Sequence, residues 1–281
     1  IFILLTVAII SLGVKNGIGK FVRILMPLLG LILILMVLNS LFSGHFLEGL
    51  RFLFSPDFSK VDSSTFLSAL GQAFFSLSLG MGAIMTYGAY MSDDRKILNT
   101  SFSVGGLDTL VALLAGLAIF PIILAVGIEF KDMKVDDGLV FVTLADTFKQ
   151  MLFGQIFGPL FFILLVIASL SSSISLLEPS VAYFSEMKIF TRTKAAIIFG
   201  SISWFLGIGS ALSFNILQDF TLLGDRSIFA SIIFIGNNLL LPLGGLFVAI
   251  FVGWFMKKEL IQDQLQLSDG VLNTWYFFIR F

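Results

Sequence analysis

The stretch SALGQAFFSLSLGMGAIMTYGAY, residues 68–90, is apolar and long enough to cross a bilayer, but small and polar residues interrupt its middle. Ser76, Ser78, Gly80 and Gly82 fall within seven consecutive residues. Glycine weakens a helix interior, and serine hydroxyls compete for backbone groups. In hydrocarbon, freed backbone N–H and C=O groups are tolerated only where they line a cavity or are buried in protein. The pattern indicates a broken span that forms a binding site, with tight helix packing by small residues as the alternative.

The composition is that of a polytopic helical membrane protein. Of the 281 residues, 57% are hydrophobic and 12% are charged, whereas a soluble domain carries about 25% charged residues. The mean hydropathy is +1.02. A net charge of −1 gives no reason to expect a nucleic-acid partner. The absence of cysteine and the single His45 exclude a disulfide framework and a thiolate or histidine metal cluster.

Apolar runs separated by short polar segments predict an all-α fold embedded in the lipid bilayer. Ile1 and Phe281 both lie in apolar runs, so we expect a chain truncated at both ends. The connections are an amphipathic loop at 44–65, a polar segment at 128–153 with a short amphipathic helix over 138–152, and a charged loop at 257–270. The predicted spans are 1–14 (the tail of a span), 21–43, the broken 66–92, 99–127, 154–187, 193–213, 228–256 and a last one beginning at WYFFIRF, 275–281.

Lys and Arg are distributed unevenly between the two sets of loops, and this bias sets the orientation because cytoplasmic loops carry the excess. One side carries ten, and Arg280 at the base of the last span adds an eleventh, while the other side carries six in longer segments. We therefore place the first set in the cytoplasm and the 44–65 and 128–153 segments outside. The cytoplasmic residues are Lys15, Lys20, Arg23, Arg95, Lys96, Lys188, Arg192, Lys194, Lys257 and Lys258; the outer ones are Arg51, Lys60, Lys131, Lys134, Lys149 and Arg226.

Asp108 lies well inside the 99–127 span, which holds no Lys or Arg to neutralise it. A charged side chain at mid-membrane costs about 2.5–3.5 kcal/mol on insertion scales, so such a group is normally paired, hydrated or functional. A carboxylate with hydroxyl and carbonyl oxygens suits a hard cation. Asp108 is thus a candidate cation ligand; a protonated Asp bonded to a neighbouring helix is the alternative.

A second polar group, Ala168 to Ser173 (ASLSSS), lies in the 154–187 span. Serine hydroxyls in membrane helices usually bond to the carbonyl one turn back, and for each of these serines taken singly this local bond is the favoured role. Ser171, Ser172 and Ser173 are consecutive, so they cannot all face the same side of the helix.

The segment FFSLSLGMGAIMTYGAY, 74–90, resembles the sixth transmembrane helix of the neurotransmitter:sodium symporters, the family of the bacterial leucine transporter. The rest of the chain agrees with that family in order and spacing. The resemblance implies an inverted-repeat fold of the leucine-transporter type, in which residues 1–281 form one transporter domain. On this basis the chain comprises the end of helix 4, helices 5–10 and the start of helix 11, with 66–256 as the second inverted repeat.

The resemblance implies two Na⁺ sites in the complete protein. Asp108 and the Ser76 hydroxyl match the first, and Ser171, Ser172 and the Ala168 carbonyl match the second. Where animal members that need chloride have a serine, this chain has Ala112, so we expect Asp108 to supply the fixed negative charge and transport to be independent of chloride.

The resemblance also implies a substrate site beside the ions. Freed backbone groups at the break would bind the ammonium and carboxylate of an amino acid. Met81 replaces a phenylalanine of the bacterial leucine transporter, and Met fills irregular space, so a broad apolar pocket is expected; ordinary core filling is the alternative for this residue. The implied substrate residues are Phe75, Ser76, Ser78 and Met81 from helix 6, with Ser172 and Leu176 from helix 8.

Three further features modify this interpretation. Gly17 and Pro27, nine residues apart, match the spacing with which the family unwinds helix 5. Ile233 stands where the family has an acidic outer-gate residue, which puts the usual ionic outer gate in doubt. Glu178 and Pro179 are expected to be structural, with the Glu facing the cytoplasmic interface.

Residues and resemblance together favour a non-enzymatic, Na⁺-coupled symporter for a neutral, apolar or aromatic amino acid or a related amine, in a bacterial plasma membrane. The rivals are a non-transporting sensor or scaffold on the same fold, and a proton-coupled transporter. An ion channel would favour a continuous polar stripe, and no nucleophile–base or metal-ligand set indicates a membrane enzyme. The oligomeric state stays open.

Overall fold

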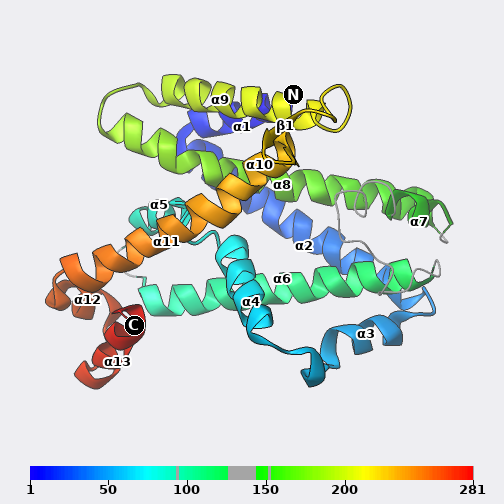
Figure 1. Ribbon diagram of the computed structural model, residues 1–281, viewed down its shortest axis with the longest axis horizontal. Helices are drawn as coiled ribbons and strands as arrows, with labels where there is room; N and C mark the ends of the chain where they lie inside the picture. Colours follow the sequence, from blue (N-terminus) through cyan, green and yellow to red (C-terminus); the bar gives the residue numbers. More distant parts are fainter. Residues whose placement is uncertain (93–94, 126–143, 151–152, 281) are drawn as a thin grey trace. The chain divides into compact units, whose positions relative to one another are not determined.

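The computed structural model describes residues 1–92, 95–125, 144–150 and 153–280, and the chain in this part is almost entirely helical (Figure 1). It divides into two compact units, which are described separately below. Unit 1 comprises Ile1–Gly13, Ser63–Gly106 and Ile174–Phe281, and unit 2 comprises Val14–Asp62 and Leu107–Ser173.

The helices follow the apolar runs of the sequence. In chain order they are α1 (Phe2–Ser11), α2 (Gly19–Leu41), α3 (Phe46–Phe54), α4 (Ser63–Ser76), α5 (Ala83–Ala89), α6 (Ile97–Ala125), α7 (Leu144–Gln150), α8 (Gly154–Glu186), α9 (Arg192–Leu212), α10 (Ile228–Ile233), α11 (Leu241–Ile250), α12 (Lys258–Leu265) and α13 (Asp269–Arg280). Shorter elements are π-helical turns at Val14–Ile18, Phe234–Leu240 and Phe251–Phe255, a 3₁₀ turn at Phe58–Lys60, and the antiparallel strands β1 (Thr221–Leu223) and β2 (Arg226–Ser227).

Five helical stretches among the described residues are long and apolar enough to cross a membrane, which agrees with the unbroken spans predicted from the sequence. Gly17 lies in the first π-helical turn and Pro27 inside α2, so these two residues mark a weakened but still helical stretch. The five stretches are Asn16–Leu41, Ile97–Ala125, Gly154–Glu186, Arg192–Leu212 and Ile228–Phe255.

Unit 2 is built around apolar side chains from α2, α6, α7 and the first half of α8. Phe148 of α7 is buried against Phe161 of α8, with ring centroids 5.4 Å apart. The Ser40 hydroxyl of α2 donates to the Leu117 carbonyl of α6 over 2.8 Å. The buried members of this core are Ile32, Leu33, Met36, Ala118, Ile122, Ile123, Leu144, Phe148, Phe161 and Ile167.

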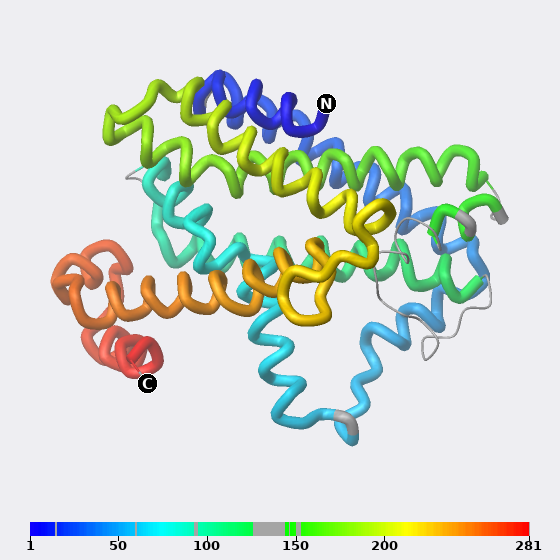
Figure 2. The backbone as a smooth tube through the Cα atoms, turned by 45° about the horizontal axis from the view of Figure 1, so that its top comes forward, coloured from blue at the N-terminus to red at the C-terminus, as the bar shows by residue number. Residues whose placement is uncertain are grey.

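In unit 1, α1 lies alongside α9 (Figure 2). A Cβ on Gly200 of α9 would collide with the Val7 side chain of α1, so the missing side chain lets the two helices approach closely. Ile10, Ala195 and Ala196 are fully buried in this unit.

Three connections differ from the sequence prediction. The segment 44–65, expected as a loop, contains α3, which packs on α6: Gly49 lies against Pro121, and the Phe52 and Phe120 rings are 4.9 Å apart. The His45 ring nitrogen also lies 2.9 Å from the Glu48 carboxylate at the start of this helix.

The charged segment 257–270 contains α12, and the last helix begins at Asp269 rather than at Trp275. The prediction underestimated these helices because their apolar residues, such as the buried Ile261 and Leu272, are widely spaced among polar ones. The connection between α9 and α10 forms a β-hairpin, which was not predicted. Of the predicted amphipathic helix at 138–152, α7 covers 144–150 and the rest lies outside the described residues.

Candidate substrate and ion sites

The predicted break in the 66–92 span is present, because α4 ends at Ser76 and α5 begins at Ala83. Between them the backbone turns left-handed three times, at Ser78 (φ 52°), Gly80 (φ 79°) and Gly82 (φ 81°). Left-handed geometry suits glycine and is rarely adopted by other residues. The Gly–Ser pattern is thus a local cause of the break.

Tertiary contacts also hold the break in place. A Cβ on Gly80 would lie 2.6 Å from the Gly245 nitrogen and 2.7 Å from the Leu241 carbonyl oxygen, both in α11. A Cβ on Gly82 would lie 3.3 Å from the Pro179 side chain in α8. Backbone therefore packs on backbone at Gly80. The span is broken, as predicted, and its small residues also allow close helix packing, which was the alternative.

The break carries four of the six predicted substrate residues, namely Phe75, Ser76, Ser78 and Met81. Leu176 belongs to the same unit and is 48% exposed on α8, one turn before the Pro179 that contacts the break. Phe75 is 51% exposed and lines a groove of about 780 Å³ within unit 1. The groove is bordered by Leu67, Leu70, Gly71, Gln72, Phe74, Phe75, Asn237, Asn238, Leu241, Pro242, Gly245, Leu246 and Ala249.

The remaining predicted ligands, Asp108, Ala168, Ser171 and Ser172, belong to unit 2. Asp108 is half-buried on α6, while Ser172 is exposed on α8. The Ser171 hydroxyl donates to the Ala168 carbonyl over 2.8 Å, the local bond that serines in membrane helices commonly make. This bond also brings together two of the oxygens predicted for the second Na⁺ site.

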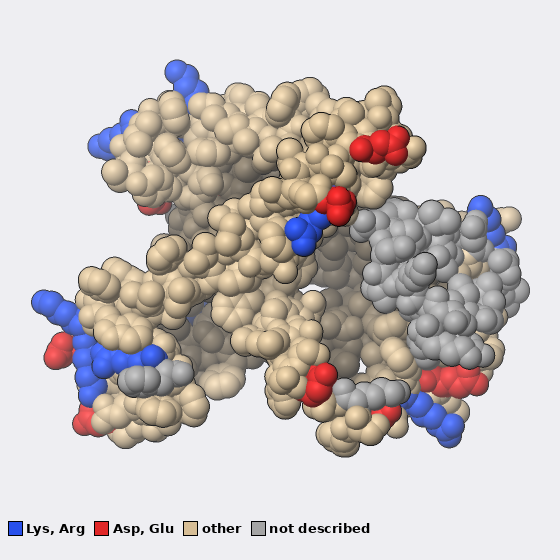
Figure 3. Space-filling model, in the orientation of Figure 1, with Lys and Arg blue, Asp and Glu red and all other residues tan. Residues whose placement is uncertain are grey.

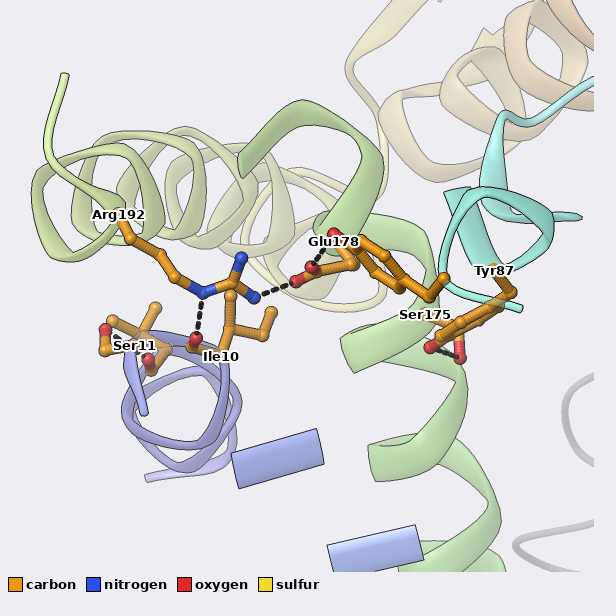
Figure 4. Close-up of polar contacts among 8 residues, drawn as sticks. Ile10, Ser11, Tyr87, Ser175, Glu178 and Arg192 are labelled. Carbon is orange, nitrogen blue, oxygen red and sulfur yellow. Dashed lines mark hydrogen bonds and ion pairs between the residues drawn. The ribbon is translucent and has the colours of Figure 1, made fainter. Parts of the chain in front are cut away.

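A polar cluster that the sequence analysis did not assemble joins α5, α8, α9 and α1 (Figure 4). Glu178 is fully buried, and both of its carboxylate oxygens are used. The Tyr90 hydroxyl donates to one over 2.8 Å, and the Arg192 guanidinium donates to the other over 2.6 Å. The Arg192 Nε also donates to the Ile10 carbonyl over 2.8 Å.

This cluster corrects the expectation that Glu178 faces the cytoplasmic interface. A buried carboxylate is stable only when it is paired and hydrogen-bonded, and both Arg192 and Tyr90 provide this. Next to it, the hydroxyls of Tyr87 and Ser175 lie 2.9 Å apart. The sequence signal that could have identified this ion pair is an acidic residue within one span, Glu178, followed by an arginine at the start of the next span, Arg192.

Comparison with known proteins identifies the same family that the sequence resembles. The family model for the sodium:neurotransmitter symporter family matches residues 1–280. An uncharacterized sodium-dependent transporter, YhdH of Bacillus subtilis, is 33% identical over 285 residues, covering 100% of this chain and 62% of that protein. A similar transporter of Haemophilus influenzae is 34% identical over 286 residues, covering 100% of this chain and 61% of that protein. The chain therefore spans about three fifths of the length of these relatives.

Among solved structures, the crystal structure of MhsT in complex with L-phenylalanine matches with a TM-score of 0.87 and 45% sequence identity. The match covers 100% of this chain and 63% of that one. Together with the membrane-length helices, these matches confirm the predicted fold class, an all-α multi-pass membrane protein of the leucine-transporter type. The chain belongs to the sodium:neurotransmitter symporter family.

Proposed function

We propose that this protein is a Na⁺-coupled symporter that carries a neutral amino acid with an apolar or aromatic side chain, or a related amine, by alternating access. The observation that carries the proposal is the unwound turn between α4 and α5, where Ser76 and Ser78 stand beside Phe75 and Met81. Unwound backbone inside a span supplies polar groups for the charged ends of an amino acid. The neighbouring apolar side chains would enclose its tail.

The two proposed Na⁺ sites combine oxygens of the types that a hard monovalent cation accepts. Asp108 and Ser76 would form the first site. Ser171, Ser172 and the Ala168 carbonyl would form the second; the 2.8 Å bond from Ser171 to Ala168 leaves lone pairs on both oxygens. Neutral ligands alone would bind Na⁺ weakly there, which suits an ion that must be released to the cytoplasm.

In this proposal Phe75, Met81 and Leu176 would form the apolar wall around the substrate tail, and Ser172 would contribute a hydroxyl. MhsT, 45% identical, was crystallised with L-phenylalanine. The sodium-dependent nutrient amino acid transporter 1 of Drosophila yakuba is 27% identical over 209 residues, covering 71% of this chain and 32% of that protein. We place the protein in a bacterial plasma membrane, with residues 66–256 as the second inverted repeat.

The first test is binding of labelled neutral amino acids to the full-length protein in Na⁺ and in K⁺. We expect binding only in Na⁺, and we expect Asp108→Asn to raise the Na⁺ concentration that supports half-maximal binding by roughly 10- to 100-fold, since a charged ligand contributes about 1.5–3 kcal/mol. Asp219→Asn is the matched control, because Asp219 is exposed in the segment before β1. Binding that is indifferent to Na⁺ would contradict the symporter and favour a sensor or a proton-coupled carrier.

Chloride should have no effect on uptake. Asp108 provides a fixed negative charge on α6, and Ala112, one turn later, has no polar atom with which to hold an anion. Uptake by vesicles at constant Na⁺ should be equal in chloride and in gluconate. Strict dependence on chloride would show that Asp108 does not carry this charge.

A sensor on the same fold is the second candidate, and it rests on Ile233, which ends α10 where the family has an acidic gate residue. The nearest acid before it on the chain, Asp225, lies in the turn between β1 and β2. Na⁺-dependent binding without uptake into vesicles would favour the sensor.

A further inference from the structure

The α12–α13 end of unit 1 combines cations, exposed aromatic rings and a buried hydroxyl for which the described residues provide no partner. The span that ends at Phe255 is followed by the extended residue Met256 and then by α12. α12 and α13 fold together over a small core of Ile261, Leu272 and Tyr276. In Figure 3, Lys and Arg side chains gather at this end of the unit, with acidic side chains beside them.

Arg280 is the centre of this region. Its Nε donates to the Gly253 carbonyl over 2.7 Å, within the π-helical turn that ends the span. Its guanidinium carbon lies 4.9 Å from the Tyr276 ring centroid and 5.6 Å from that of Trp254. These contacts fix the guanidinium, and because the side chain is exposed, its terminal nitrogens can donate to a ligand.

Tyr276 supplies the second observation. The residue is only 8% exposed, yet its hydroxyl has no hydrogen-bond partner among the residues that the structure describes. A buried tyrosine hydroxyl usually finds a partner. Arginine can only donate, and a tyrosine hydroxyl donates readily, so an acceptor-rich anion would satisfy both groups.

Two lysines add positive charge at the start of α12. Lys257 is exposed at its N-cap position, and the Lys258 ammonium donates to the Asn273 amide oxygen of α13 over 2.7 Å. These two lysines and Arg280 are close in the fold because α13 returns to the end of the span, as the Arg280 bond to Gly253 requires.

This region carries as many acids as cations, so a preference for an anion depends on where the charges lie. Glu259 and Asp263 each lie two residues from the buried Ile261, about 200° around α12, so both point away from the core. Asp269 accepts a hydrogen bond from Gln262 over 2.7 Å and begins α13, eleven residues before Arg280. On α12 the two acids thus lie on the face opposite Ile261, while Lys258 is bonded to α13.

The location favours a membrane lipid. Trp254 is 53% exposed and Phe255 is 74% exposed at the end of a membrane-length helix, and aromatic residues with basic neighbours are typical of the headgroup region. The Lys and Arg distribution assigns this end to the cytoplasmic side, where the leaflet is anionic.

We propose that Lys257, Lys258, Arg280 and Tyr276 bind the headgroup of an anionic phospholipid, with Trp254 beside its glycerol backbone. The arginine and the tyrosine hydroxyl donate to the phosphate, while the lysines add longer-range attraction to the net negative charge of the lipid. A zwitterionic lipid has the phosphate but also a cation, which the lysines repel.

The test uses the full-length protein in phosphatidylcholine vesicles that contain brominated phosphatidylglycerol or brominated phosphatidylcholine. Bromine quenches nearby tryptophan, and the signal of Trp254 is the difference between wild type and Trp254→Phe. Because each of the two lysines near an anionic headgroup changes the affinity by about fivefold, we expect phosphatidylglycerol to reach half-maximal quenching at a roughly 25-fold lower mole fraction than phosphatidylcholine.

Lys257→Gln/Lys258→Gln should reduce this preference to about twofold or less, and Tyr276→Phe, which removes only the hydroxyl, should also lower it. The matched control is Lys188→Gln/Lys194→Gln, an exposed lysine pair on the same predicted side of the membrane, and it should keep the preference. Equal quenching by the two lipids in wild type, or a full preference in the Lys257/Lys258 variant, would overturn the proposal. Neither readout depends on transport or on Na⁺, so the result is separate from that of the proposed function.

Discussion

Replacing Gly80 with alanine should abolish substrate binding and lower the thermal stability of the folded protein. The new methyl group would lie 2.6 Å from the Gly245 nitrogen and 2.7 Å from the Leu241 carbonyl oxygen, and neither backbone atom can rotate away as a side chain could. Alanine would also have to hold a φ of 79°, which costs about 1–2 kcal/mol. With the overpacking, we expect a loss of roughly 2–5 kcal/mol.

Gly88→Ala is the matched control for this experiment. Gly88 lies in α5, a few residues after the break, and no atom lies within 4 Å of a Cβ placed there. Alanine also favours a helix over glycine by roughly 1 kcal/mol, so this variant should be at least as stable as wild type. Thermal unfolding in detergent and substrate binding should be measured for both variants. If Gly80→Ala matches Gly88→Ala in both assays, the break does not require a glycine at position 80.

Arg192→Gln should be the most destabilising single change in the cluster around Glu178. It would leave a fully buried carboxylate with only the Tyr90 hydroxyl as a charge-stabilising partner in the described structure. Removing one partner of a buried ion pair costs about 3–5 kcal/mol. Glu178→Gln should cost less, because the Arg192 side chain is 22% exposed and can reach water. Thermal unfolding in detergent should rank the two variants in this order.

The double variant Glu178→Gln/Arg192→Gln separates pairing from packing. If the cost comes from an unpaired charge, the double variant should be more stable than Arg192→Gln alone. Glu186→Gln, at the exposed end of the same helix α8, should leave stability unchanged. An Arg192→Gln protein as stable as Glu186→Gln would mean that the ion pair does not stabilise the fold.

Much of the fold could be predicted because hydrocarbon imposes a simple rule. A span must be an apolar helix of nearly fixed length, so spans such as 99–127 and 193–213 agree with α6 and α9 within a few residues. The rule weakens at the membrane surface, where helices need only a few apolar anchors. α12 was missed for that reason, α3 was missed because its nine residues are too few to cross the membrane, and the β-hairpin was missed because its strands have two and three residues.

The parts of the candidate site that depend on one short sequence segment could be predicted. The Ser–Gly pattern at residues 76–82 is sufficient to place the break, since left-handed backbone and small residues occur together. Gly80 is packed against Gly245, and Glu178 bonds to Tyr90, which directly follows α5; both contacts join residues that are far apart along the chain. No periodicity within one helix can identify such pairs, which depend on how helices pack.

The hydrogen bond from Arg192 to the Ile10 carbonyl joins residues 182 positions apart, and this separation has a consequence for biosynthesis. At about 5–20 residues per second, a ribosome needs roughly 10–35 s to travel that distance. During this time α1 has been made but α9 has not, so the face of α1 that carries Val7 and Ile10 lacks its final neighbour. Lipid or the insertion machinery must shelter that face until translation reaches α9, and a ribosome pause between the two helices would lengthen the exposure.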